Sequence, residues 1–207
     1  MLHSSFSILH SQFFILHSSF FILHSQFFIL NSSFFIPNSV IPMMFGDLLL
    51  KPAKPALTSQ VSGEIFASLR VFARTNKLGI AVPGNAAFFV HLPHRKHLSP
   101  DVAYYIGPRT DKDFYPQAPV LAVEIRSEND YGLQAEEELH RRRADYFQAG
   151  TEVVWDVDLQ SDEVIRVYRA TSPENPTIYR RGDFAEAEPA LSGWSMLVDD
   201  LFDEETK

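Results

Sequence analysis

The sequence predicts a mixed α/β domain in which helices pack against a central sheet. Three observations lead to this prediction: a stretch with helical spacing of apolar residues comes first, strand-like runs follow, and a second helical stretch precedes two or three further strands. This domain takes up residues 47–207, which are enough to bury one hydrophobic core.

The segment 1–42 is unlike the rest of the chain, because its sequence repeats every seven residues from LHSSFSI to LNSSFFI. The block Phe-Phe-Ile-Leu would cover about 300° of a helix, which leaves no single buried face and argues against a coiled coil. We expect this low-complexity heptapeptide repeat to be disordered, or to be an intergenic DNA repeat read through from an upstream start codon. In the second case Met43 or Met44 is the true start.

Charge and cysteine content exclude several classes of protein. The net charge of −8 and the pI of about 5.4 argue against broad attraction to nucleic acid, although a local basic track is compatible with them. The chain has no cysteine, which excludes disulfides and thiolate metal sites and suits a reducing cytosol. The sequence has no stretch typical of a membrane span or a signal peptide, so we expect a cytoplasmic protein without membrane contact.

The first predicted helix covers residues 60–76, with Ser59 as its N-cap. Its apolar residues recur at helical spacing, namely at Val61, Ile65, Leu69 and Phe72. Strand-like runs follow it at 79–82, 87–92, 101–106 and 120–127.

The second predicted helix covers residues 133–148 and stops before Gly150. Residues 151–159 then alternate apolar and acidic side chains, a pattern typical of a half-buried strand whose Asp156 and Asp158 face solvent. A polar turn joins this strand to 164–170, which predicts a hairpin. The tail at 182–202 stays unassigned.

Two acidic residues on neighbouring predicted strands are the main candidates for a functional site. Asp101 begins one strand and Glu124 lies near the end of the next, so an antiparallel hairpin brings both carboxylates to the same end of the sheet. Because side chains alternate along a strand, Glu124 and Arg126 share one face. Two neighbouring carboxylates are suitable ligands for a divalent metal ion. Taken singly, each acid also fits a turn or an exposed strand edge.

On the second helix, one cation lies on the face that should pack against the sheet. Ala135, Leu139, Arg142 and Tyr146 fall within one stripe. A guanidinium on a buried stripe needs an anionic partner, which the carboxylate pair or a bound phosphate could supply. Tyr146 and Trp155 are expected in the core.

A short basic segment, HLPHRKH, is predicted to form a loop. The spacing of His91, His94 and His97 could bind a transition metal, but it also fits a solvated, slightly basic loop. With Arg95 and Lys96, these histidines could instead contact phosphates.

The runs PDVAYY, AVEIRSENDYG and RRRADYFQAGTEVVWDVD resemble the Uma-two family of restriction-endonuclease-like proteins, part of the PD-(D/E)XK nuclease superfamily. The resemblance implies a restriction-endonuclease-like mixed central β-sheet flanked by helices. It places the metal-binding acids at Asp101 and Glu124; with the main-chain carbonyl of Ile125 they would hold Mg²⁺ or Mn²⁺. Arg126 stands where the superfamily has lysine, and Arg142 stands where this family has its substitute lysine.

The resemblance implies a metal-dependent DNA endonuclease that hydrolyses phosphodiester bonds, with DNA as substrate and a homodimer that cuts both strands. Arg142 or Arg126 would bind the phosphoryl oxygens. Arginine stays charged where a lysine could give up its proton, so a second interpretation is an inactive nuclease-fold module that binds nucleic acid or protein. A structural accessory protein of a mobile element is a third.

Overall fold

The computed structural model describes residues 56–108, 110–111 and 114–202. The predicted repeat, at residues 1–42, and Met43 and Met44 lie outside the described residues. In chain order the elements are α3 (Ala56–Asn76), β1 (Ile80–Pro83), β2 (Phe88–Phe89), β3 (His97–Leu98), β4 (Val102–Tyr105), β5 (Leu121–Ile125), α4 (Leu133–Gln148), β6 (Val153–Val157), β7 (Ile165–Arg169), β8 (Ser172–Tyr179), β9 (Phe184–Ala187), β10 (Leu191–Leu197) and the short 3₁₀ helix η1 (Val198–Leu201).

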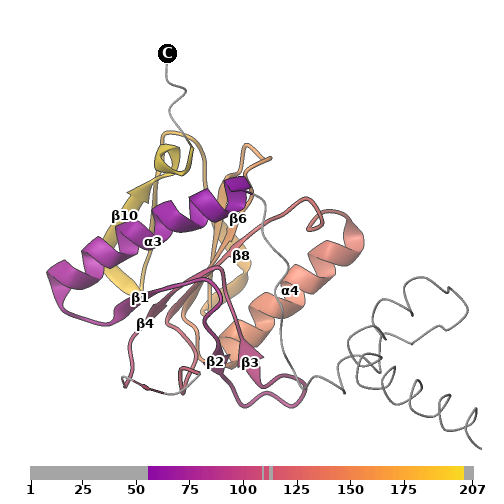
Figure 1. Cartoon of the computed structure of the whole chain (residues 1–207). Helices are drawn as coiled ribbons and strands as arrows, with labels where there is room; N and C mark the ends of the chain where they lie inside the picture. Colours follow the sequence, from indigo (N-terminus) through magenta and orange to yellow (C-terminus); the bar gives the residue numbers. More distant parts are fainter. Residues whose placement is uncertain (1–55, 109, 112–113, 203–207) are drawn as a thin grey trace, which may run out of the picture. The chain divides into compact units, whose positions relative to one another are not determined.

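A six-stranded mixed sheet forms the centre of the fold, in the order β1-β4-β5-β6-β7-β8 (Figure 1). Neighbouring strands are antiparallel except β5 and β6, which run parallel and are joined through α4. This is the crossover that a parallel pair requires. The predicted mixed α/β fold is therefore confirmed, as is the antiparallel pairing of the strands that carry Asp101 and Glu124.

The two long helices cover opposite faces of this sheet. Val123 of β5 belongs to the same core cluster as Ile65 of α3, whereas its neighbour Ala122 packs with Tyr146 of α4. Because consecutive strand residues point to opposite faces, α3 and α4 lie on different sides. Glu124, two residues after Ala122, consequently faces α4.

The boundaries of α4 agree with the sequence prediction, while those of α3 do not. Gly150 has φ 103°, a left-handed conformation that suits glycine just after a helix. Ser59 lies inside α3 and is not its N-cap, because the helix already includes Ala56. The strand expected at 87–92 is short, since β2 pairs with β3, a strand within the segment expected to be a loop.

The prediction that Asp156 and Asp158 face solvent is wrong. Both residues are buried, with 2% and 5% of their surface exposed, because β6 lies between β5 and β7 beneath α4. The acidic positions of the alternating pattern face a buried set of ion pairs and not water. Trp155, by contrast, is in the core as predicted, where its ring lies 5.1 Å from that of Trp194.

No helix in the described part of the chain is both long and apolar enough to cross a membrane.

Candidate metal centre

Asp101 lies immediately before β4, at the end of the sheet where β5 finishes. Its backbone N–H donates to the carbonyl of Val123 over 2.9 Å, and its Oδ2 accepts a 2.9 Å hydrogen bond from the N–H of Ile125. Since Val102 is paired with Val123, this register sets Asp101 beside Glu124. Asp101 is 3% exposed, so its carboxylate is held in a defined place.

Glu124 is bound by two groups from α4. The Tyr146 hydroxyl donates to Oε1 over 2.6 Å, and Nη1 of Arg142 donates to Oε2 over 3.2 Å. Arg142 and Tyr146 are four residues apart, so they project from neighbouring turns on the same face of the helix. The structure thus brings together Glu124 and the cation that the sequence places on the buried stripe.

The hydroxyl of Tyr146 is buried beside Glu124. Burial raises the pKa of Tyr146 well above its ordinary value, and the negative charges of Glu124 and Asp101 raise it further. The hydroxyl therefore stays protonated and remains a donor to Glu124. Burial alone would lower the pKa of Arg142, but Glu124 and its other neighbours raise it, so this guanidinium is also permanently charged.

The structure does not bring Arg126 to the acid pair, although the sequence predicts it as an alternative phosphate-binding group. Its Nε and Nη2 each donate to Asp156 over 2.8 Å, and its two terminal nitrogens also donate to Glu136. Only 5% of the Arg126 side chain is exposed. These donors therefore bind carboxylates of an internal ion-pair cluster. Asp156 belongs to this cluster because β6, on which it lies, is the parallel neighbour of β5.

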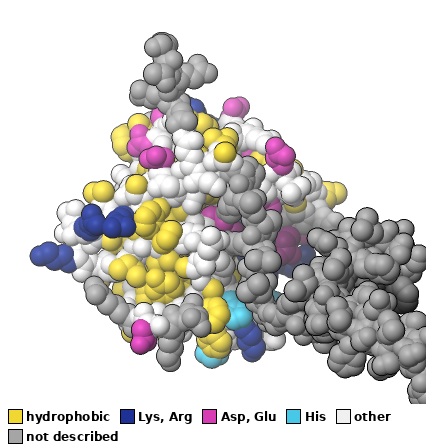
Figure 2. Space-filling view, in the orientation of Figure 1, with side chains coloured by type: hydrophobic (Ala, Val, Ile, Leu, Met, Phe, Trp, Pro, Cys, Tyr) yellow, Lys and Arg dark blue, Asp and Glu magenta, His cyan; other side chains and the backbone are white. Residues whose placement is uncertain are grey.

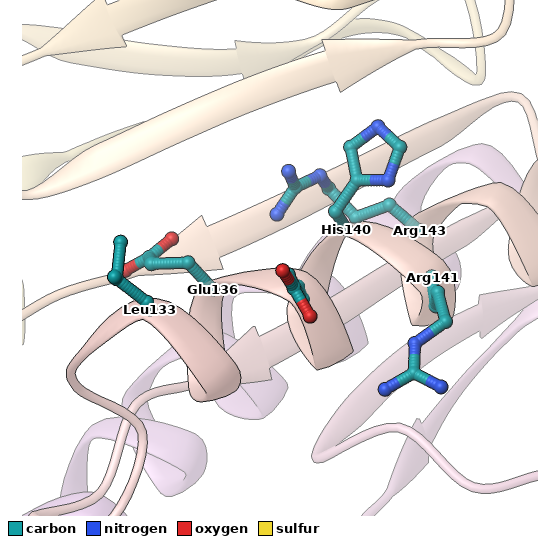
Figure 3. A pocket seen from close by; sticks show the side chains of 6 residues that line it. Leu133, Glu136, His140, Arg141 and Arg143 are labelled. Carbon is teal, nitrogen blue, oxygen red and sulfur yellow. The ribbon is translucent and has the colours of Figure 1, made fainter.

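This cluster continues beneath α4 through Arg143. Its Nη1 lies 3.6 Å from Asp156 Oδ2, and its guanidinium lies 4.1 Å from the ring centre of Tyr168. An open pocket over the cluster is lined by Leu133, Glu136, Glu137, His140, Arg141 and Arg143. Figure 3 shows Arg141 pointing away from His140 and Arg143 in this pocket. None of Asp101, Glu124 and Arg142 lines it, so the pocket is separate from the acid pair.

The chemistry of the donors around the acid pair fits a hard divalent cation. Asp101 and Glu124 offer carboxylate oxygens, and the backbone of Ile125 adjoins Asp101. An ionised carboxylate can accept several bonds, so a carboxylate that is hydrogen-bonded can also bind a metal ion. Within the described residues no group of three His, Cys, Asp or Glu side chains could hold a metal. A site with two acids suits Mg²⁺, which usually keeps several water ligands.

The contact of Tyr146 with the candidate site is one that the sequence interpretation missed. Its expected place in the core is correct, since 1% of its surface is exposed. However, its hydroxyl also holds Glu124. The available signal was its spacing of four residues from Arg142, which puts both side chains over the same strand.

Comparisons with known proteins agree with this architecture. A profile of the family described as "Uma2: Putative restriction endonuclease" matches residues 40–199. The chain is also similar to a solved structure from Anabaena variabilis ATCC 29413, titled as that of "a putative nuclease belonging to DUF820", with a TM-score of 0.59. The two share 18% identity over 73% of this chain and 83% of the other, a likeness that concerns the fold. No curated protein matches the chain.

Proposed function

Because the chain belongs to the Uma2 family, described as "Putative restriction endonuclease", we propose that it is a metal-dependent DNA endonuclease acting at Asp101 and Glu124. One observation carries the proposal: the two buried acids meet at one end of the sheet, on the face covered by α4, with Arg142 bound to Glu124. Hydrolysis of a phosphodiester needs a cation, a positioned water and a group that stabilises the developing charge.

Each residue of the site has a role in this proposal. Asp101, Glu124 and the carbonyl of Ile125 hold Mg²⁺ or Mn²⁺, which when bound acts as a Lewis acid and lowers the pKa of a water ligand. Tyr146 keeps Glu124 oriented through its hydrogen bond. Arg142 binds the phosphoryl oxygens and stabilises their charge without transferring a proton.

The test is cleavage of DNA by the full chain with Mg²⁺ or Mn²⁺. Asp101→Asn and Glu124→Gln keep the shapes of the side chains but remove the charges that hold the cation, so each is expected to abolish cutting. Glu137→Gln, an exposed position on α4, is the matched control and should cut like the wild type. If the wild type cuts neither duplex nor branched DNA with either metal, the proposal fails.

Calorimetry separates metal binding from cutting. We expect calorimetry to detect heat of Mn²⁺ binding with the wild-type chain and none with the Asp101→Asn variant. Equal binding by the two proteins would show that the acid pair does not hold the ion.

Two further parts of the proposal concern assembly and location. A homodimer would place two sites on opposite strands of a duplex, and sedimentation of the full chain with DNA would detect it. The lack of cysteine suits action in the cytoplasm.

The second candidate function is a nuclease-fold module that binds DNA or a protein without cutting. The observation that favours it is Arg142, because an arginine cannot act as the proton acceptor that a lysine can become. Metal binding without cleavage across all DNA substrates would support this function.

A further inference from the structure

The loop that joins β2 to β3 concentrates basic groups in a chain whose net charge is −8. Residues 91–96 of this loop have the sequence HLPHRK and contain no acid. In Figure 2, histidine and basic side chains gather at the lower edge of the described domain, where Figure 1 places β2 and β3. We call residues 91–96 the basic loop.

Apolar packing and backbone hydrogen bonds hold the basic loop against the α4 side of the sheet. Val90, Leu92 and Leu98 share a core cluster with Tyr146. The N–H of Val90 donates to the carbonyl of Lys96 over 2.8 Å and closes the loop. The loop is thus docked beside the tyrosine that holds Glu124.

Two carboxylates of α4 orient the cations of the loop. Asp145 accepts contacts from His94 at 2.9 Å and from Arg95 at 2.8 Å. Arg95 also lies 3.9 Å from Glu138, which forms a 2.9 Å ion pair with Arg141. Arg142, which contacts Glu124, lies four residues after Glu138 and therefore one turn further along α4. Arg95 and Arg141 thus contact one carboxylate, and Arg142 on the next turn leads from them to the acid pair.

The cations of this surface are more accessible than the acid that anchors the loop. Asp145 is buried, whereas Arg141 exposes 67% of its side chain and Arg95 and Arg142 each expose 32%. Lys96 is exposed at the end of the loop, immediately before β3. We call these four cations, Arg95, Lys96, Arg141 and Arg142, the basic track. Glu138, which is partly exposed, pairs with two of them, Arg95 and Arg141.

We infer that the basic track, Arg95, Lys96, Arg141 and Arg142, binds the sugar-phosphate backbone of duplex DNA as it passes the acid pair. This inference deepens the proposed function and rests on it, because a nuclease must hold the strand on at least one side of the phosphate it cuts. Cations of this kind position the substrate and carry no base sequence. The ion pairs of Arg95 with Asp145 and of Arg141 with Glu138 keep these two guanidinium groups in place before DNA arrives, which lowers the entropy cost of binding.

The test measures how salt affects binding of a fluorescently labelled DNA duplex to the full chain in EDTA, where metal-dependent cutting is prevented. Removing one cation that neutralises a phosphate should make the slope of log K against log salt shallower by about 0.9. We therefore expect this change in Lys96→Ala and in Arg141→Ala, and about twice this change in the double variant. Arg74→Ala removes an exposed cation from α3, on the opposite face, and should leave the slope unchanged.

The inference is overturned if the wild type does not bind the duplex, or if both variants keep the wild-type slope and affinity. Thermal unfolding of each variant checks that the fold is intact, and both substituted side chains are exposed. Cleavage assays keep the two proposals apart. A chain that cuts DNA with an unchanged salt slope contradicts the basic track alone, whereas a chain that binds through Lys96 and Arg141 but never cuts contradicts the endonuclease alone.

Discussion

The hydroxyl of Tyr146 donates a 2.6 Å hydrogen bond to Oε1 of Glu124, while Arg142, one turn earlier, binds Oε2 of the same carboxylate. Both groups come from α4, the helix that connects β5 to the parallel strand β6. The helix that makes the parallel pairing possible therefore also orients the acid. Packing of α4 on the sheet and the geometry of the site are consequently coupled.

Tyr146→Phe should weaken metal binding, because Glu124 loses the group that orients it. Partners that orient a metal ligand are typically worth 10–100-fold in affinity, so we expect Mn²⁺ to bind at least about 10-fold more weakly by calorimetry. The matched control is Tyr179→Phe, which removes a 3.0 Å bond to Glu186 between β8 and β9. Equal Mn²⁺ affinity in the two variants would contradict a role of Tyr146 at the site.

Arg126→Ala should destabilise the fold by about 3–5 kcal/mol, because it leaves Asp156 charged and buried without its main partner. The two side chains are 5% and 3% exposed. Replacing both, as Arg126→Met with Asp156→Leu, should recover much of the loss, and urea unfolding measures each variant. Arg142→Ala, at a side chain 32% exposed, should cost only about 1 kcal/mol. If the Arg126→Ala protein were as stable as the wild type but could not cut DNA, Arg126 would have a role in catalysis and not in stability.

Arg142→Lys distinguishes a working arginine from a decayed site. If arginine binds the phosphoryl oxygens, lysine loses the planar fork of donors and cutting should slow by about 10-fold or more in single-turnover assays. Asp101→Asn provides the inactive baseline. Cutting that begins only in the lysine variant would instead identify the wild type as the non-cutting module.

The fold should lose stability between about pH 10 and pH 12, in part through Tyr131. Partial desolvation of this half-exposed ring and the 2.8 Å hydrogen bond to Asp158 raise the pKa of Tyr131 from 10.0 to about 12. Over this range the unfolded chain releases the proton while the folded chain keeps it, so rising pH favours unfolding. Tyr131→Phe should lose less stability than wild type in urea unfolding at a series of pH values. Parallel pH profiles for the two proteins would contradict this assignment.

Local patterns were sufficient to predict much of the arrangement around the candidate site. The stripe through Arg142 and Tyr146 and the glycine after the helix both act over a few residues, and the strands of Asp101 and Glu124 follow each other directly in the sequence. For this reason the residue spacing alone predicted the boundaries of α4 and the pairing of β4 with β5 correctly. Alternation along β5 also predicted correctly that Glu124 and Arg126 share a face.

Contacts between distant segments could not be predicted in this way. Asp156 reaches Arg126 from 30 residues further along the chain, after a helix has returned the chain to the sheet. Periodicity describes which side of a strand a residue occupies, but not whether that side meets water or another element. The same limit hid the docking of the basic loop, where Asp145 binds Arg95 across 50 residues of sequence.

By itself, then, the sequence predicted the order of α3, β4, β5, α4, β6 and β7, the strand positions of the two acids, and the helix stripe that meets Glu124, because each depends on local spacing. Only the tertiary structure decided which cation serves the acid pair. In the sequence, Arg126 and Arg142 are both candidate partners of the acid pair. In the fold, β6 supplies a buried carboxylate that binds Arg126, whereas Arg142 is partly exposed and contacts Glu124. A buried charge must be paired, and pairing between strands is settled by packing.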